Sequence, residues 1–261
     1  MEWRFADGKY ERLPGLAADL VRLNPEVIVT HSTPATEALQ RATKTIPIVF
    51  GSATDPVASG FARSLARPGG NITGLSLMNI DVSQKYLELL KTLVPRLSRA
   101  AVLMNPGSSY HPAILKGVQA AARPLGVTLL PVDARTPDDL ERGFAAMGRE
   151  RAEAVIVLSD AFFLGRRRQI AELAVQRRLP SMFSFREQVE AGGLVSYGQN
   201  VADFYRSAAT YVHKILEGAR PGELPIDQPT KIHLAINRKT AKAIGLAIPR
   251  ELLVRADEVI E

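Results

Sequence analysis

The chain has 261 residues, of which 46% are hydrophobic and 23% are charged, so it can bury a core large enough to offset the entropy of ordering and is not a disordered chain. It contains no cysteine, which excludes disulfide scaffolds, thiolate metal sites and cysteine nucleophiles. Its net charge of +6 is dispersed, and no basic stretch interleaved with aromatic residues indicates binding to nucleic acid.

The N-terminus and the one tight run of basic residues give two further expectations. Met1–Phe5 lacks the basic and apolar regions of a secretory signal, and no apolar run approaches the roughly 18 residues that span a bilayer. We therefore expect no transmembrane helix, in a protein that either is cytoplasmic or has lost its leader. Arg166–Arg168 falls in a predicted amphipathic helix, where a solvated helix face is the ordinary explanation.

Short apolar runs alternate with longer segments of helical periodicity along the whole chain. Most of these runs are apolar throughout, which is typical of parallel strands covered on both faces. The predicted strands, with Glu2–Phe5 as a further candidate, are Val27–Thr30, Pro47–Phe50, Ile72–Leu75, Ala100–Met104, Val127–Val132, Ala154–Leu158, Ser181–Phe183 and Leu194–Tyr197.

The segments between these runs carry apolar residues at helical spacing, such as Leu16, Leu20 and Leu23. Strands and helices in regular alternation predict parallel sheets with right-handed crossovers. The predicted helices are Leu13–Leu23, Val82–Val94, Ala113–Ala122, Pro137–Gly148, Arg166–Arg178 and Ala202–Leu216.

A coarse two-fold echo divides the predicted strands into one series near residues 27–75 and a second near residues 100–197. The joint falls near Arg96–Arg99, and each series is close to the usual size of a domain. We therefore predict an α/β protein of two Rossmann-like lobes. The first lobe is residues 1–97, the second is residues 98–192, and residues 193–261 form a return segment that crosses between the lobes and completes both.

Polar residues collect directly after the predicted strands. In open parallel sheets, ligands sit outside the carboxyl ends of the strands, so we expect these residues to line a small-molecule cleft. The candidate ligand-binding residues are Ser32, Thr33, Thr54, Asp55, Asn105, Ser159, Asp160 and Ser184, together with the aromatic residues Tyr110, Phe162 and Tyr197.

Two of these turns are predicted to begin helices. Thr33-Pro34 and Asp55-Pro56 have the pattern of an N-cap followed by proline at the first helical position. A helix N-terminus can hold a carboxylate or phosphate without any lysine. Each turn taken alone is usually only a cap, as we expect for Thr136-Pro137. The indication of a ligand site therefore comes from the polar turns of both strand series taken together, not from any single turn.

No constellation of residues indicates catalysis or a cofactor. The histidines His31, His111, His213 and His233 have no metal-ligand spacing, and no nucleophile elbow, Walker or dinucleotide motif is present. Asp55 and Asp160 could act as a carboxylate pair, or could form ion pairs with a ligand ammonium group. We therefore expect a binding protein without catalytic residues, metal or cofactor, rather than an enzyme.

Several longer motifs resemble one family. They resemble ABC-transporter substrate-binding proteins of the tryptophan-binding, TrpX-like group, which have the type I periplasmic binding protein fold. The resemblance extends over essentially the whole chain, and its motifs are Ile46–Phe50, Thr54–Val57, Ser64–Gly74, Leu87–Lys91, Gly192–Gly198, Tyr211–Leu216, Gln228–Lys231 and Arg255–Ile260.

The resemblance implies a two-lobed receptor that captures a small solute between its lobes by hinge closure and presents it to a membrane permease. It also implies a periplasmic or other extracytoplasmic location. Characterised relatives take aromatic amino acids. The cleft positions that the resemblance implies are Ser32, Thr33, Thr54, Asp55, Asn105, Ser159, Asp160 and Tyr197.

One departure from the family concerns the N-terminus. Family members begin with a signal peptide and then a first strand and helix ahead of the segment that resembles Glu2–Phe5, and these are absent here. The first strand would lie at the sheet centre beside Val27–Thr30. We therefore expect an incomplete first lobe, whose exposed strand edge could pair with a second chain in a dimer.

The leading hypothesis is a receptor for an amino-acid-like ligand, with aromatic amino acids among the options. Its carboxylate would sit on Ser32, Thr33 and the N–H groups of the helix that starts at Pro34, and its ammonium near Asp55 or Asp160. Two alternatives stay open, a cytoplasmic sensor of small molecules and an α/β isomerase that uses the two aspartates. The aromatic residues that would cover the ligand side chain are Tyr110, Phe162 or Tyr197.

Overall fold

The computed structural model describes residues 1–261 and divides into two compact units. Unit 1 is Met1–Met78 with Val201–Thr230, and unit 2 is Asn79–Asn200 with Lys231–Glu261. The division therefore falls before helix α3 (Ser83–Leu93), rather than at the predicted joint near Arg96–Arg99. The reason is that Leu87 and Leu90 of α3 share a buried core with Ile114 and Val118 of α4 (His111–Leu125) in unit 2.

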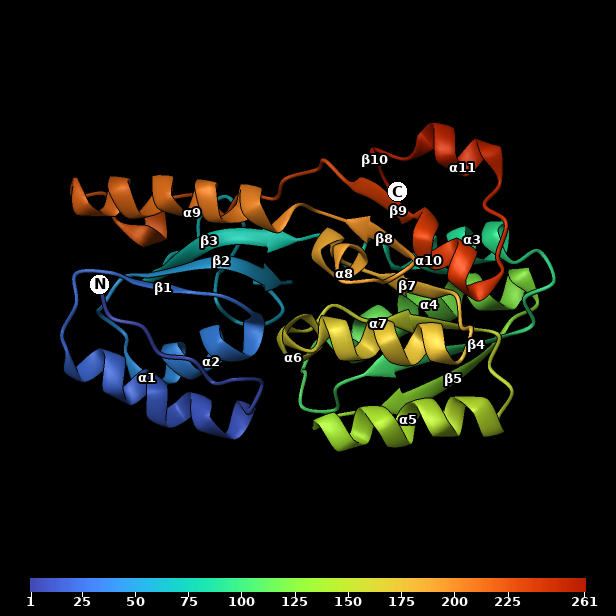
Figure 1. Ribbon diagram of the computed structural model, residues 1–261. Coiled ribbons are helices and arrows are strands. Elements are labelled where there is room, and N and C mark those ends of the chain that lie inside the picture. Colours follow the sequence, from blue (N-terminus) through green and yellow to red (C-terminus); the bar gives the residue numbers. More distant parts are fainter. The chain divides into compact units, whose positions relative to one another are not determined.

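Unit 1 is built on a three-stranded parallel sheet in the order β1-β2-β3. Helix α9 contacts one side of β2 and β3, and α1 and α2 pack together on the opposite side (Figure 1). All residues of β2 are buried, as expected for a strand covered on both faces. The bounds are β1 Ile28–Thr30, β2 Ile48–Thr54, β3 Ile72–Leu77, α1 Leu13–Arg22, α2 Thr33–Ala42 and α9 Val201–Leu216.

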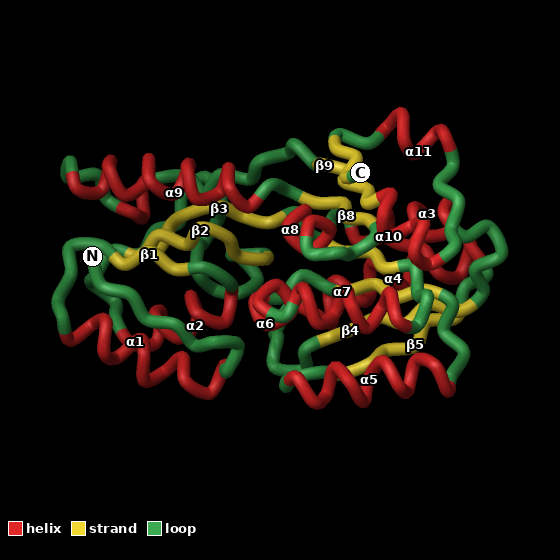
Figure 2. The backbone as a smooth tube through the Cα atoms, in the orientation of Figure 1, coloured by secondary structure: helices red, strands yellow, loops and turns green.

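The predicted strand at Glu2–Phe5 is absent. Figure 2 draws the chain before the short helix η1 (Tyr10–Arg12) as a loop, and β1 at the sheet edge pairs with β2 alone. Trp3 and Phe5 are each 64% exposed, and their rings stack on one another at 6.1 Å. The alternation of apolar and charged residues is therefore present, but no neighbouring strand supplies the hydrogen bonds that a strand needs.

Unit 2 contains a seven-stranded sheet in the order β10-β9-β8-β7-β6-β4-β5. Every pair is parallel except β8 with β9, which is antiparallel. The sequence did not indicate β9 and β10. The bounds are β4 Arg99–Met104, β5 Thr128–Asp133, β6 Ala154–Val157, β7 Ser181–Phe183, β8 Val195–Gly198, β9 His233–Asn237 and β10 Glu258–Ile260.

Alternate residues of the central strands supply the two cores of unit 2. Ala100 and Val102 of β4 pack with α3, α4, α10 and α11, whereas Ala101 and Leu103 pack with α5 and α7 on the other face. None of the helices is both long and apolar enough to cross a bilayer. The remaining bounds are α5 Pro137–Arg149, α6 Ala161–Gly165, α7 Arg167–Gln176, α8 Arg186–Glu190, α10 Arg238–Ile244, α11 Arg250–Arg255 and the short helix η2 Pro221–Glu223.

The structure confirms one of the three predicted helix N-caps and contradicts the other two. Thr136 and Asp139 form the expected reciprocal capping box of α5. The N-cap of α2 is Ser32, so Thr33 and Pro34 are its first two residues. No helix follows Asp55, because its carboxylate and carbonyl close a turn by accepting the N–H groups of Ala58 and Ser59. The predicted N-cap roles of Thr33 and Asp55 are therefore wrong.

A substitution at Gly74 tests how closely β2 and β3 approach one another. It has a φ of +149°, and a Cβ there would lie 2.1 Å from the carbonyl oxygen of Phe50. We expect Gly74→Ala to lower the free energy of unfolding by about 2–4 kcal/mol, because it adds both backbone strain and overlap. Urea unfolding followed by circular dichroism measures this change.

The matched control is Gly70→Ala in the same unit, where nothing lies within 4 Å of the added methyl. We expect that variant to unfold within about 1 kcal/mol of the parent protein. Equal losses in both variants would show that the β2–β3 contact is not the cause.

Candidate functional site

The strand order of unit 2 reverses between β4 and β6. From β4 the chain moves outward to β5 and then returns to β6 on the other side of β4. The crevice outside the carboxyl ends of strands at such a reversal is where open α/β sheets bind ligands. Asn105 directly follows β4, and Ser159 and Asp160 follow β6 after one residue. The structure therefore brings these three predicted residues together.

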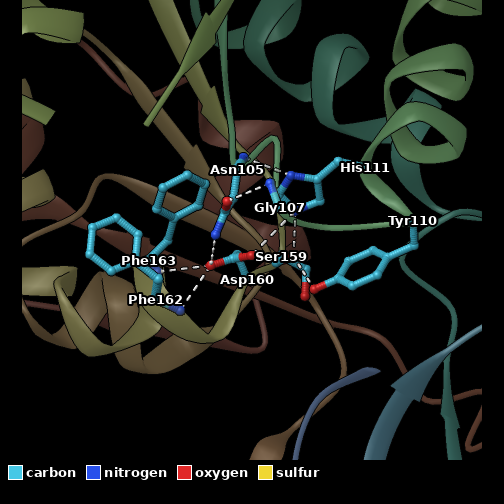
Figure 3. Close-up of polar contacts among 8 residues, drawn as sticks. All are labelled: Asn105, Gly107, Tyr110, His111, Ser159, Asp160, Phe162 and Phe163. Atoms are coloured by element: carbon cyan, nitrogen blue, oxygen red, sulfur yellow. Dashed lines mark hydrogen bonds and ion pairs between the residues drawn. The ribbon is translucent and has the colours of Figure 1, made fainter. Parts of the chain in front are cut away.

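A buried histidine joins the ends of the two strands. The N–H of Asn105 donates to Nδ1 of His111 at 2.8 Å, and Nε2 of His111 lies 3.0 Å from the carbonyl oxygen of Ser159. The hydroxyl of Tyr110 donates to the same carbonyl at 3.0 Å. Figure 3 shows this group of side chains and its polar contacts. The turns after β4 and β6 are thus fixed to one another through α4.

Asp160 combines burial with a structural role. Asp160 is 3% exposed. Its Oδ1 accepts the N–H groups of Phe162 and Phe163 at 2.8 and 3.3 Å and thereby caps α6. The amide of Asn105 also donates to this oxygen at 3.4 Å. Three N–H donors thus hold this carboxylate at the strand ends, an arrangement that stabilises a negative charge in a place of low dielectric.

Ser184 and Tyr197 lie at the ends of the adjacent parallel strands β7 and β8. Ser184 is 2% exposed, and the hydroxyl of Tyr86 on α3 donates to its Oγ at 3.2 Å. Burial raises the pKa of Tyr86 to about 12, partly offset by this hydrogen bond, so its proton stays in place. Ser184 can therefore use its own hydroxyl hydrogen for another acceptor.

Two predicted aromatic residues are more enclosed than an open ligand platform would be. Phe162 is 3% exposed and belongs to the core between the sheet and α5 and α7, with its ring 5.5 Å from that of Phe163. Tyr110 is 8% exposed. Tyr197 is only half-buried and packs at the border of the opposite core. Of the three, Tyr197 is the most accessible.

Unit 1 gathers its own predicted residues at the carboxyl ends of β1 and β2. The Oγ1 of Thr33 accepts the N–H of Thr54 at 2.9 Å, and the N–H of Ser32 donates to the carbonyl of Ser52 at 2.9 Å. Thr33 and Thr54 are both 1% exposed. Asp55 follows Thr54 but is exposed, and its carboxylate holds the turn described above.

Ser32 has an unusual backbone conformation, with φ +80° and ψ 150°. This region is essentially restricted to glycine, and a side chain there costs on the order of 1–3 kcal/mol. The Ser32 side chain makes no capping bond to α2. A strained serine where glycine would be relaxed keeps Ser32 among the candidate ligand-binding residues, since strain concentrates at functional sites.

His31 occupies a place in unit 1 that resembles that of His111 in unit 2. Its Nδ1 lies 2.9 Å from the Oγ of Ser52, and its ring stacks on Tyr205 of α9 at 5.7 Å. Burial lowers the pKa of His31 to about 4. The imidazole is therefore uncharged at neutral pH, and it joins the end of β1 to β2.

Sequence reasoning missed several residues of these edges, namely His31, Ser52, Tyr86, Ser108 and His111. Ser108 lies in the turn after β4, and its Oγ is buried without a hydrogen-bond partner in the protein. The available signal was weak, a lone histidine immediately after a strand or its polar turn. No group of three or more His, Asp or Glu side chains is arranged to hold a metal ion.

The strain at Ser32 gives the first of two testable predictions from these strand ends. We expect Ser32→Gly to raise the free energy of unfolding by about 1 kcal/mol by relieving strain, and to weaken ligand binding because the hydroxyl is lost. Ser32→Ala is the matched control, since it removes the hydroxyl but keeps the strained backbone, and should weaken binding without stabilising the protein. Urea unfolding and calorimetry measure the two effects, and a destabilised Ser32→Gly would contradict this assignment.

His31 gives a second prediction, about acid stability. In the unfolded chain His31 becomes protonated below its usual pKa of about 6.5. In the folded protein it becomes protonated only near pH 4. The free energy of unfolding therefore falls as the pH falls through this window. Between pH 7 and 5 we expect a loss of about 1–2 kcal/mol beyond that of His31→Asn, which can keep the bond to Ser52 but cannot titrate. Identical urea-unfolding curves for both proteins across the window would refute it.

Comparison with known proteins gives the family. The profile of the ABC transporter substrate-binding proteins matches residues 1–260. A curated tyrosine-binding protein of Clostridioides difficile strain R20291 is 26% identical over 232 residues, which are 88% of this chain and 66% of that protein. The chain thus spans slightly less than two thirds of that relative.

Two solved structures are similar over nearly the whole chain. A conserved domain protein of Vibrio cholerae O1 biovar El Tor has a TM-score of 0.92 at 30% identity, covering 99% of this chain and 86% of that one. The ABC domain from Streptococcus pneumoniae in complex with L-Trp has a TM-score of 0.88 at 25% identity, covering 97% and 87%. The chain therefore belongs to the ABC transporter substrate-binding protein family and has the type I periplasmic binding protein fold.

Proposed function

We propose that this protein is the solute receptor of an ABC importer and binds an L-amino acid with an aromatic side chain. The observation that carries the proposal is that two relatives matching most of the chain are named for such ligands, tyrosine in one and L-Trp in the other. The polar strand ends of both units supply suitable groups. In this proposal the protein binds its ligand without transforming it.

The ligand carboxylate is assigned to the start of α2. This helix has ten residues and no side-chain cap, so the N–H groups of its first turn and the Ser32 hydroxyl can receive a negative charge. Thr33 and Thr54 fix the backbone on which these donors lie.

The ligand ammonium is assigned to Asp160 rather than Asp55. The Asp160 side chain is fully buried, and a buried carboxylate gains far more from a cationic partner than an exposed one. Asp55 is exposed, so an ion pair there would be weakened by water and salt. Ser184 and Tyr197 remain for the ligand side chain, where Tyr197 offers an aromatic surface.

The proposal includes the mode of action expected for the family. Binding selects a closed arrangement of the two lobes by hinge motion, and the closed form is presented to a membrane permease outside the cytoplasm. Pairing of two chains through the edge of β1, where Val29 is 48% exposed, stays a prediction.

Matched ligands test this function. We expect L-tryptophan or L-tyrosine to bind with a Kd near 1 μM, and to stabilise the protein by about 2.7 kcal/mol at one hundred times that Kd. Tryptamine lacks the carboxylate and indole-3-propionate lacks the ammonium, and each should bind at least about tenfold more weakly because a buried charge of the site stays unpaired. Isothermal titration calorimetry and thermal unfolding measure both effects.

The control variant is Ser64→Ala, whose hydroxyl bonds locally to Arg67 on the exposed surface of unit 1. It should bind like the parent protein, whereas Ser32→Ala should not. Equal binding of L-tryptophan and tryptamine would exclude recognition of an amino acid as such. Absence of binding across the twenty amino acids would reject the proposed ligand class.

A further inference from the structure

His111 is held by two backbone groups with opposite requirements. The Asn105 N–H can only donate, so Nδ1 must be the unprotonated acceptor. The Ser159 carbonyl can only accept, so Nε2 must carry the hydrogen. The two contacts together fix one tautomer, the uncharged Nε2–H imidazole, without reference to any other group.

The side chains packed around the His111 ring leave it little room to rotate. Its side chain is 1% exposed, the ring of Tyr110 meets it edge-on at 5.1 Å, and Phe163 lies nearly parallel at 6.3 Å. The facing charged groups are Asp160, whose Oδ2 is 3.8 Å from Nε2, and the more weakly interacting Asp133 on β5. Burial lowers the pKa of His111 more than Asp160 raises it.

We propose that His111 is a positioning residue of the ligand site, whose uncharged imidazole holds the turns after β4 and β6 at the separation that ligand binding requires. The inference rests on the proposed function, because the ligand is what makes that separation matter. Asn105, Ser159 and Asp160 all lie on these two turns, and His111 bonds to the backbone of both.

Protonation would undo this arrangement at an identifiable atom. A hydrogen on Nδ1 would face the Asn105 N–H, so two donors would point at each other and the bond would be lost. The imidazolium would also be drawn toward Asp160 and would compete with a ligand ammonium for its charge. Ligand affinity should therefore fall as the pH is lowered, although a free amino acid does not itself change charge in this range.

Two substitutions separate positioning from simple filling of space. His111→Gln offers one acceptor and one donor, as the imidazole does, but cannot titrate. His111→Phe keeps a ring but leaves the Asn105 N–H without its side-chain acceptor, and the Ser159 carbonyl then keeps only the Tyr110 hydroxyl as a side-chain donor. We expect the Kd for L-tryptophan to stay within about threefold in the glutamine variant and to rise about tenfold or more in the phenylalanine variant, since an unpaired buried group costs about 1–3 kcal/mol.

The pH profile and the tautomer supply readouts that space filling would not change. As the pH is lowered, the Kd of the parent protein should rise more steeply than that of His111→Gln. ¹⁵N NMR of the ligand-free parent protein should show His111 with an unprotonated Nδ1 and a protonated Nε2 at pH 7.5. Equal pH profiles, the opposite tautomer, or equal affinity in the folded phenylalanine variant would each overturn the inference.

Failure of this inference is distinguishable from failure of the proposed function. If the parent protein binds no amino acid, the function is wrong, and the NMR tautomer still tests the geometry of His111. If the parent protein binds L-tryptophan and His111→Phe binds it equally well, the function stands and the positioning role falls. If His111→Phe does not fold, His111→Gln is the test, since it keeps one donor and one acceptor. A tenfold or greater loss of affinity in that variant would overturn the inference but not the proposed function.

Discussion

The reversal of strand order between β4 and β6 is the constraint on which the polar edge of unit 2 depends. Because the chain leaves β4 toward β5 and returns to β6 on the opposite side, the two connections diverge at the strand ends, as they do at the ligand-binding edges of open α/β sheets. Polar groups buried at this edge are removed from bulk water and must find partners. Asn105, Asp160 and the Ser159 carbonyl do so through His111 and the first turn of α6.

An uncharged histidine at the strand ends is common to both units. His31 joins β1 to β2 through a serine hydroxyl, and His111 joins the turns after β4 and β6 through two backbone groups. In each, burial disfavours the charged imidazole. Imidazole suits this position because one rigid ring accepts on one side and donates on the other, which lets it link two backbone segments without adding a buried charge.

Most of the fold, but only part of the candidate site, could be predicted from the sequence. Continuous apolar runs identified β1 to β8. The apolar runs of β9 and β10 are only three and two residues long, Leu234–Ile236 and Val259–Ile260, and the sequence analysis did not predict them as strands. The carboxyl-end rule located Asn105 and Asp160, since it depends on strand direction alone. It could not indicate that Asp160 is buried and Asp55 is exposed, because burial depends on the packing around each turn. The role of His111 could not be predicted, because its partners are backbone groups, which have no sequence signature.

The division of unit 1 between two distant parts of the chain has a consequence for its synthesis. The strands β1 to β3 leave the ribosome early, but α9, which covers β2 and β3, follows only after most of unit 2 has been made. At roughly 5–20 residues per second, this delay is on the order of ten seconds. During that interval the apolar flank of the three-stranded sheet lacks its cover, and exposed apolar surface of this kind is prone to aggregation.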